Sequence, residues 1–204
     1  MQREDWDRKY AAQEQLWSVH PNRLLVQEVA ELAPGRALDL ACGEGRHAIW
    51  LAELGWRVSA VDFSEVAIAK ARDRAEHAGL EVDFHSADLR DFEPEPRAFD
   101  LVLVFFLQLP ADERRVILSR AADAIAPGGT FLLVGHDLLN LTDGVGGPSD
   151  AHVLYTSDDI VAELPGLEIE KAERVLRDVA DADRSAIDVL VRARRAIPRD
   201  ADIR

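Results

Sequence analysis

The sequence is poor in cysteine, in long apolar segments and in basic residues. Its one cysteine, Cys42, excludes an internal disulfide and a cysteine-only metal cluster. The longest apolar run, residues 101–107, is far shorter than the ~20 residues that a membrane-spanning helix needs. The first ten residues are charged and have no apolar core, so we expect neither a secretory signal nor a membrane partner.

Basic residues are also outnumbered. The 204 residues include 38 acidic and 24 basic ones, which gives a formal charge of −14. Proteins that bind nucleic acid need clustered lysine and arginine to neutralise the phosphates, so we expect no nucleic-acid partner. The hydrophobic fraction of 48% is that of an ordinary globular chain. The single cysteine suits a reducing compartment, so we expect a cytoplasmic protein. The residues do not decide between a monomer and a homodimer.

The chain alternates helical and strand patterns, which is typical of an α/β sheet with helices on both faces. We expect a single domain over residues 1–204, with a helical N-terminal segment (1–34), a Rossmann-like core (35–195) and a tail (196–204). The expected strands are 37–41, 57–61, 80–85, 99–105, 130–135, 167–177 and 184–194. The expected helices are 2–17, 22–32, 46–54, 65–78, 112–125 and 157–163. A polar turn between the last two strands predicts an antiparallel hairpin.

The segment Leu38–Ala48 (LDLACGEGRHA) joins the first strand to a helix through two glycines. Gly43 and Gly45 allow a sharp turn and let a ligand approach the backbone amides closely. Asp62 lies 19 residues after Gly43, just beyond the second strand, where a carboxylate can accept both hydroxyls of a ribose. The pattern therefore predicts a nucleoside site, although its glycine spacing also matches the dinucleotide fingerprint.

Asp39, at the end of the first strand, favours one cofactor over the other. A carboxylate there repels the phosphates of a dinucleotide. It tolerates the sulfonium and ammonium groups of S-adenosylmethionine, and the acidic net charge favours the same cofactor. We therefore expect S-adenosylmethionine as cofactor.

Five segments carry a family resemblance. They are residues 38–46 (LDLACGEGR), 61–64 (VDFS), 86–92 (SADLRDF), 99–106 (FDLVLVFF) and 127–129 (PGG). In this order they resemble the motifs of class I S-adenosylmethionine-dependent methyltransferases. The pattern is most similar to the small single-domain enzymes of the tellurite-resistance and thiopurine methyltransferase type. The resemblance covers most of the chain, from about Trp6 to Arg194.

The resemblance implies a seven-stranded mixed sheet, with the final hairpin as strands six and seven and the N-terminal helices as a lid over the cofactor. It also implies the cofactor-binding residues, with Asp62 on the ribose and Asp88 on the adenine amino group. The full set comprises Trp17, Asp39, Ala41, Cys42, Gly43, Gly45, Arg46, Asp62, Phe63, Ser64, Asp88, Leu89 and Phe105. No metal is expected, because the histidines lack ligand spacing, although a divalent cation at Asp137 or Asp143 stays open at the level of sequence.

His136 and Asp137, directly after the fifth strand, are the candidate catalytic residues. An imidazole, whose ordinary pKa is about 6.5, is a suitable general base at neutral pH. The polar, glycine-rich stretch 137–155 that follows suits a hydroxylated acceptor such as a sugar. The chain has no Asn/Asp-Pro-Pro-aromatic motif after the fourth strand, which argues against an amino group of a nucleic acid. We therefore expect methyl transfer to a hydroxyl oxygen of a small molecule.

Other functions remain open at the level of sequence. Sulfur, selenium or tellurium could replace oxygen as the acceptor atom. A nicotinamide-dependent oxidoreductase would use the same glycine turn, although Asp39 opposes its pyrophosphate. A non-catalytic module that senses S-adenosylmethionine would need the same donor site and no acceptor site.

Overall fold

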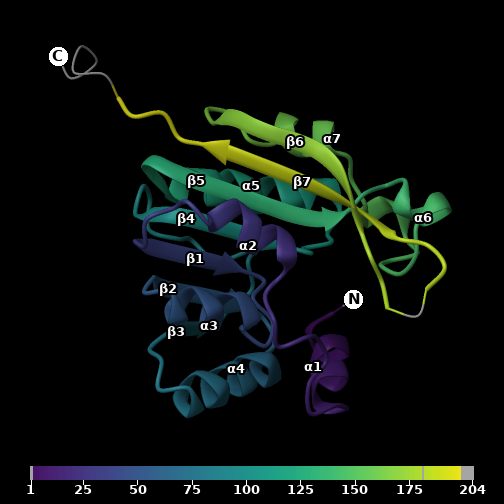
Figure 1. Ribbon diagram of the computed structural model, residues 1–204, viewed down its shortest axis with the longest axis horizontal. Coiled ribbons are helices and arrows are strands. Elements are labelled where there is room, and N and C mark those ends of the chain that lie inside the picture. Colours follow the sequence, from purple (N-terminus) through teal and green to yellow (C-terminus); the bar gives the residue numbers. More distant parts are fainter. Residues whose placement is uncertain (1, 181, 199–204) are drawn as a thin grey trace. The chain divides into compact units, whose positions relative to one another are not determined.

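The computed structural model describes residues 2–180 and 182–198. Seven strands form a sheet with the order β3-β2-β1-β4-β5-β7-β6 (Figure 1). This order and the antiparallel pairing of the last two strands confirm the predicted Rossmann-like mixed sheet. The chain divides into two compact units, Met1–Glu93 and Pro94–Arg204. The predicted single domain stays a prediction, and most of the predicted tail lies outside the described residues.

The first unit is a parallel sheet covered by helices. Its elements are α1 (Arg3–Ala11), α2 (Arg23–Val29), β1 (Arg36–Leu40), α3 (Arg46–Glu53), β2 (Arg57–Asp62), α4 (Glu65–His77) and β3 (Asp83–Ser86). The strand β2 pairs in parallel with β1 and with β3. The helices α3 and α4 pack on these strands. Parallel strands buried in this way are apolar on both faces, which explains why β1 and β2 read clearly in the sequence.

Helix starts in this unit follow the local chemistry of the sequence. The side chain of Asn22 accepts a hydrogen bond from the N–H of Leu24 at the start of α2. The Ser64 hydroxyl accepts one from the N–H of Ala67 at the start of α4. Both contacts satisfy amide groups that have no partner within the helix. The predicted N-cap at Ser64 is therefore confirmed.

The first helix is shorter than the sequence predicts. It ends at Ala11, whereas the pattern predicts a helix to residue 17. The Lys70 side chain of α4 donates to the carbonyl oxygens of Tyr10 (2.6 Å), Gln13 (2.6 Å) and Glu14 (3.1 Å). These contacts stabilise the carbonyl groups at and beyond the helix end in a non-helical arrangement. The helix therefore ends early because of a side chain about 60 residues away in the sequence.

The second unit contains the other four strands. Its elements are β4 (Phe99–Phe105), α5 (Ala111–Ala124), β5 (Ile125–His136), α6 (Asn140–Asp143), the 3-10 helix η1 (Ala151–Val153), α7 (Ser157–Ala162), β6 (Glu168–Arg177) and β7 (Ala186–Arg194). β4 and β5 are parallel, β5 and β7 are antiparallel, and β6 and β7 form the predicted hairpin. α5 packs on β4 and β5, and α7 packs on β6 and β7.

The strand β5 begins five residues before its predicted start. Its register with β4 pairs Ile125 with Phe99 and then Thr130 with Leu101, so residues 126–129 leave the ladder between them. A Cβ atom on Gly129 would lie 2.9 Å from the carbonyl oxygen of Phe99. The predicted Pro-Gly-Gly turn is thus present as a bulge within β5. Only glycine fits at position 129.

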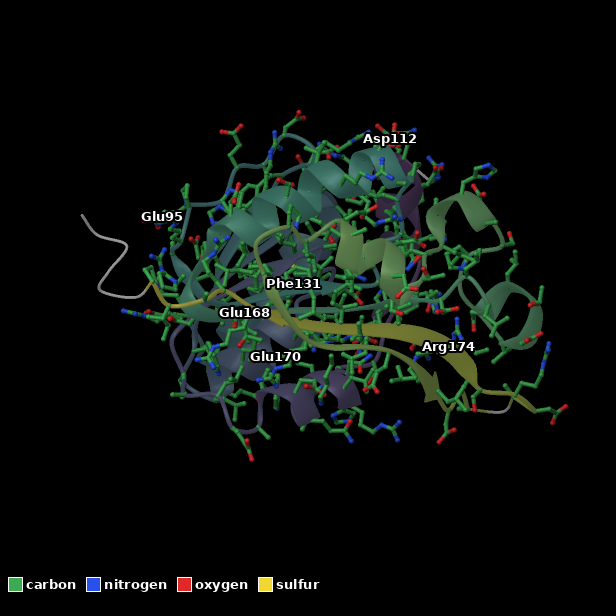
Figure 2. All side chains as sticks on the ribbon, turned by 90° about the horizontal axis from the view of Figure 1, so that it is seen from above. Glu95, Asp112, Phe131, Glu168, Glu170 and Arg174 are labelled. Carbon is green, nitrogen blue, oxygen red and sulfur yellow. The ribbon has the colours of Figure 1, made fainter. Side chains whose placement is uncertain are left out.

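The interior of the second unit is mostly apolar, with a few buried charged residues, while its edge strand β6 is charged. Phe131 of β5 is fully buried. Figure 2 places Glu168 and Glu170 toward one end of β6 and Arg174 toward the other. Charged side chains on an edge strand disfavour pairing with another chain. Among the described residues, no helix has both the length and the apolar character needed to span a membrane.

Candidate functional site

The turn after β1 is built on left-handed backbone. Ala41, Gly43 and Gly45 have φ values of 62°, 55° and 75°. A Cβ atom on Gly45 would lie 2.9 Å from the Cβ atom of Ala71 and 3.0 Å from the ring of Phe84. Glycine is therefore required at position 45 both for its backbone conformation and for its packing against α4 and β3. The turn brings α3 close to the end of β1, as the sequence predicts.

Ala41 occupies a backbone conformation that favours glycine, so we expect Ala41→Gly to stabilise the protein. A left-handed alanine is strained by about 1 kcal/mol, and the greater freedom of glycine in the unfolded chain offsets part of that gain. We expect a free energy of unfolding that rises by up to about 1 kcal/mol, measured by urea denaturation. Ala52→Gly, inside α3, is the matched control and should lower it by about 0.5–1 kcal/mol. A loss of stability in Ala41→Gly would contradict this reading of the strain.

Asp62 joins the glycine turn to the second strand. Its Oδ2 accepts from the N–H of Gly43 and its Oδ1 from the N–H of Ser64, both at 2.9 Å. Burial raises the pKa of this carboxyl, and these two donated hydrogen bonds oppose the rise. Each carboxylate oxygen has a further lone pair that can accept a hydroxyl group. The structure therefore brings Gly43 and Asp62 together as the sequence predicts.

Asp39 is a buried carboxylate with no well-aligned hydrogen bond from any described residue. It is 1% exposed, and among the residues that the structure describes neither oxygen has a hydrogen-bond partner. Burial, reinforced by the nearby Asp62, raises the pKa of Asp39 to about 7, while Arg46 and the backbone N–H of Ala48 oppose the rise. A buried carboxylate without a partner is costly, which suits a site for a cation. The left-handed turn, Asp39 and Asp62 thus fit a positively charged ligand that carries a ribose.

The N-terminal segment is held against this turn by two charged groups. The Glu44 carboxylate is buried and accepts from the N–H groups of Leu16 (3.0 Å) and Trp17 (3.3 Å). Lys70 lies 3.3 Å from the same carboxylate while it holds the carbonyl groups at the end of α1. The Tyr10 hydroxyl lies 2.9 Å from where a Cβ atom on Gly43 would stand. Sequence reasoning did not single out Glu44 or Lys70, because only the fold reveals their shared target.

The remaining sequence-predicted residues of the first unit differ in surroundings. The Asp88 carboxylate is held by the side chain of Arg90, which lowers its pKa. Burial raises the pKa of the Cys42 thiol, which suits a packing residue. Ser64, besides capping α4, donates its hydroxyl hydrogen to Asp7. Trp17 is 50% exposed, and its ring centroid lies 6.4 Å from that of Trp6. Leu89 is buried, and Ala41, Arg46 and Phe63 are half-buried.

The second unit contains a separate polar cluster at the end of β5. His136 Nδ1 lies 3.1 Å from Oδ1 of Asp188, a fully buried residue of β7. Arg177 of β6 binds the same carboxylate, with 2.6 Å between Nε and Oδ2. The Phe106 ring centroid lies 5.1 Å from that of His136. Phe106 has a φ of 57°, a strained value for a bulky residue, and Phe105 before it is buried at the end of β4.

Asp137 faces the backbone of the loop that follows. It is 1% exposed, accepts from the N–H of Leu139 at 2.8 Å, and lies 3.1 Å from Nε of Arg174. These contacts are those of a residue that shapes the loop. Asp188 and Arg177 were missed by sequence reasoning, because nothing in their local pattern marks them. The pairing of β5 with β7 places Asp188 opposite His136, and this contact is visible only in the folded chain.

Comparison with known proteins shows what the chain is similar to. Residues 37–129 match a family described as a methyltransferase domain. The ubiquinone biosynthesis O-methyltransferase of Xanthomonas euvesicatoria pv. vesicatoria (strain 85-10) is 31% identical over 130 residues, which cover 63% of this chain and 54% of that protein. The chain spans about half the length of the curated relatives that it matches.

Two solved structures have a similar fold over most of the chain. A protein from a study of the conversion of a disulfide bond into a thioacetal group in echinomycin biosynthesis is 25% identical, with a TM-score of 0.76. The match covers 98% of this chain and 95% of that one. TehB from Haemophilus influenzae is 20% identical, with a TM-score of 0.73, over 95% of this chain and 67% of that one.

Proposed function

Because the chain belongs to the class I S-adenosylmethionine-dependent methyltransferases, we propose that it transfers a methyl group from S-adenosylmethionine to a hydroxyl oxygen of a small molecule. The observation that carries the donor half of this proposal is Asp39, a buried carboxylate with no partner among the described residues. A cationic ligand at the neighbouring turn would supply that partner. A dinucleotide would instead bring phosphates toward a carboxylate, so a nicotinamide-dependent oxidoreductase is not favoured.

Residues of the first unit would hold the donor. In this proposal Asp39 faces the positive charge, the backbone of the turn from Ala41 to Gly45 accommodates close approach, and Asp62 accepts the ribose hydroxyls. Asp88 and Phe63 would border the adenine, as the family resemblance implies. When bound, the donor supplies a methyl group on a positively charged sulfur, which an acceptor atom displaces in line.

The N-terminal segment would act as a lid over the donor. The contacts of Glu44 with the Leu16 and Trp17 amides and of Lys70 with the end of α1 hold this segment against the glycine turn. A lid that excludes water favours methyl transfer, because the charge on sulfur disappears in the transition state. Lid closure would thus depend on one buried carboxylate and one lysine.

His136 would serve as the base for the acceptor. A hydroxyl group is a weak acid, so a base that removes its proton as the methyl group arrives speeds transfer. The imidazole lies at the carboxyl end of β5 and contacts Asp188, an arrangement that suits a base oriented by a carboxylate. Asp137, whose contacts are with the loop and Arg174, would support the base by shaping the loop.

A sulfur acceptor is the second candidate. The observation that favours it is the 25% identity, over nearly the whole chain, to a protein studied in the conversion of a disulfide bond into a thioacetal group. A thiol ionises near pH 8.5 and needs little help from a base. The two candidates therefore differ in their dependence on His136.

The test is a panel of small alcohols, phenols, polyols and thiols incubated with donor carrying a labelled methyl group. We expect label on an oxygen acceptor, and His136→Gln should lower kcat on it by about 100-fold or more. Donor affinity, measured by calorimetry, should stay unchanged in this variant. His152→Gln is the matched control, since its side chain is 91% exposed, and it should leave kcat unchanged. Labelling of thiols alone, with turnover unaffected by His136→Gln, would favour the sulfur reading.

A further inference from the structure

The imidazole of His136 is enclosed on several sides. Its ring packs on Phe106, and a Cβ atom on Gly147 would lie 2.9 Å from ring atoms Cγ and Cδ2 and 3.0 Å from Nε2. Gly147 has a φ of 76°, so the loop passes directly against the ring where no side chain could fit. A ring held this closely has one orientation, and the roles of its two nitrogens are therefore set by their neighbours.

The nitrogen Nδ1 faces Asp188. It is buried, and within the described part of the chain it has no hydrogen-bond partner in good alignment. Oδ1 of Asp188, 3.1 Å away, is the acceptor within reach. The two residues are directly opposite each other in the antiparallel β5–β7 register, so their side chains emerge on the same face of the sheet. The backbone pairing itself therefore fixes this contact.

Arg177 binds this carboxylate from the side of β6. Its Nε and Nη2 lie 2.6 Å and 3.5 Å from the two oxygens of Asp188, and its guanidinium lies 5.5 Å from the ring centroid of Phe106. A fully buried carboxylate is costly when it is ionised without a cation. The short contact of Arg177 is with Oδ2, and Oδ1 is shared by the longer Nη2 contact and the imidazole. The charged groups that face His136 in the structure are thus Asp188 of β7 and, behind it, Arg177 of β6.

We propose that Asp188 is a positioning residue for His136, and that Arg177 fixes the orientation of its carboxylate. Asp188 accepts the hydrogen of Nδ1, which leaves the lone pair on Nε2 to take a proton from the acceptor hydroxyl. The catalytic step moves that proton from the acceptor oxygen to Nε2 while the oxygen binds the methyl carbon and the carbon–sulfur bond breaks. This inference rests on the proposed function and makes the base dependent on the final hairpin.

The variant Asp188→Asn separates this role from a structural one. The shorter hydrogen bond of Arg177 is with Oδ2, so the new amide should keep its oxygen there, give up the 3.5 Å contact with Nη2 and turn its NH2 group toward Nδ1. An NH2 group there can only donate, which forces the hydrogen of the imidazole onto Nε2. We expect the 15N NMR signals of neutral His136 to switch from the Nδ1–H to the Nε2–H form. We also expect kcat to fall by about 100-fold with unchanged KM and unchanged donor affinity.

Controls make the outcomes distinct. Asp178→Asn changes the same charge at the exposed end of the hairpin and should alter neither the NMR signals nor kcat. If Asp188→Asn does not fold, Arg177→Gln provides the second test and should shift His136 partly toward the Nε2–H form. An unchanged Nδ1–H form in a folded Asp188→Asn protein would overturn the positioning role. If His136 switches to the Nε2–H form but kcat is unchanged, Asp188 does position the imidazole, and the role of His136 as the base is overturned.

Discussion

Replacing Asp39 by asparagine is expected to raise the free energy of unfolding of the donor-free protein at pH 8. Burial raises the pKa of this carboxyl to about 7, well above the ordinary value of an aspartate, and among the described residues no well-aligned hydrogen bond offsets that rise. Above pH 7 the ionised Asp39 side chain therefore lowers the free energy of unfolding by about 4 kcal/mol. A buried amide without a partner costs about 1–3 kcal/mol itself, so we expect a net gain of about 1–3 kcal/mol.

The sign of the pH dependence follows from the raised pKa. The unfolded chain releases this proton first, so the stability of the native protein falls as the pH rises from about 4 to 7. The advantage of Asp39→Asn should accordingly shrink between pH 8 and pH 5, as measured by urea denaturation at both values. Glu81→Gln removes an exposed carboxylate of the same unit and should change little at either pH. Equal stability of wild type and Asp39→Asn at pH 8 would contradict the unpaired state of Asp39.

The same variant should bind S-adenosylmethionine more weakly, by tenfold or more, if the donor cation faces Asp39. Wild-type affinity should increase from pH 5 to pH 7 as the carboxyl ionises, and binding should release protons. Asp39→Asn should lose this increase. Calorimetry in buffers of different ionisation enthalpy measures both quantities. A stabilised variant that retains full affinity would show that Asp39 faces something other than the donor.

Glu163→Ala is expected to destabilise the second unit by about 3–5 kcal/mol, because it leaves a buried arginine without its counter-charge. Arg114 donates to both oxygens of Glu163 at 2.8 Å, and its side chain is 4% exposed. Its guanidinium also lies 4.8 Å from the ring centroid of Tyr155, which cannot replace a carboxylate. Urea denaturation measures the loss.

Two comparisons identify the cause of that loss. Glu173→Ala removes an exposed carboxylate and should change the free energy of unfolding by no more than about 0.5 kcal/mol. The double variant Arg114→Met/Glu163→Leu removes both charges and should recover most of the lost stability. A double variant as unstable as Glu163→Ala would show that packing, and not the unpaired charge, is responsible.

The sequence by itself determined the order and approximate positions of the strands, most helices and the glycine turn. These features depend on local rules: apolar residues in buried parallel strands, Ser64 as an N-cap, and glycine where the backbone is left-handed. The proximity of Gly43 and Asp62 was also predictable, because both follow neighbouring parallel strands. Most of the first-unit residues proposed to bind the methyl donor could therefore be predicted from the sequence.

Only the tertiary structure decided the features that depend on distant partners. The end of α1 is set by Lys70, the unpaired state of Asp39 by its surroundings, and the contact of His136 by Asp188 across a strand register. Each involves a polar group whose partner, or lack of one, is fixed by packing. The local sequence around a residue does not indicate such partners, because hydrogen bonds and ion pairs depend on distances that exist only in the folded chain.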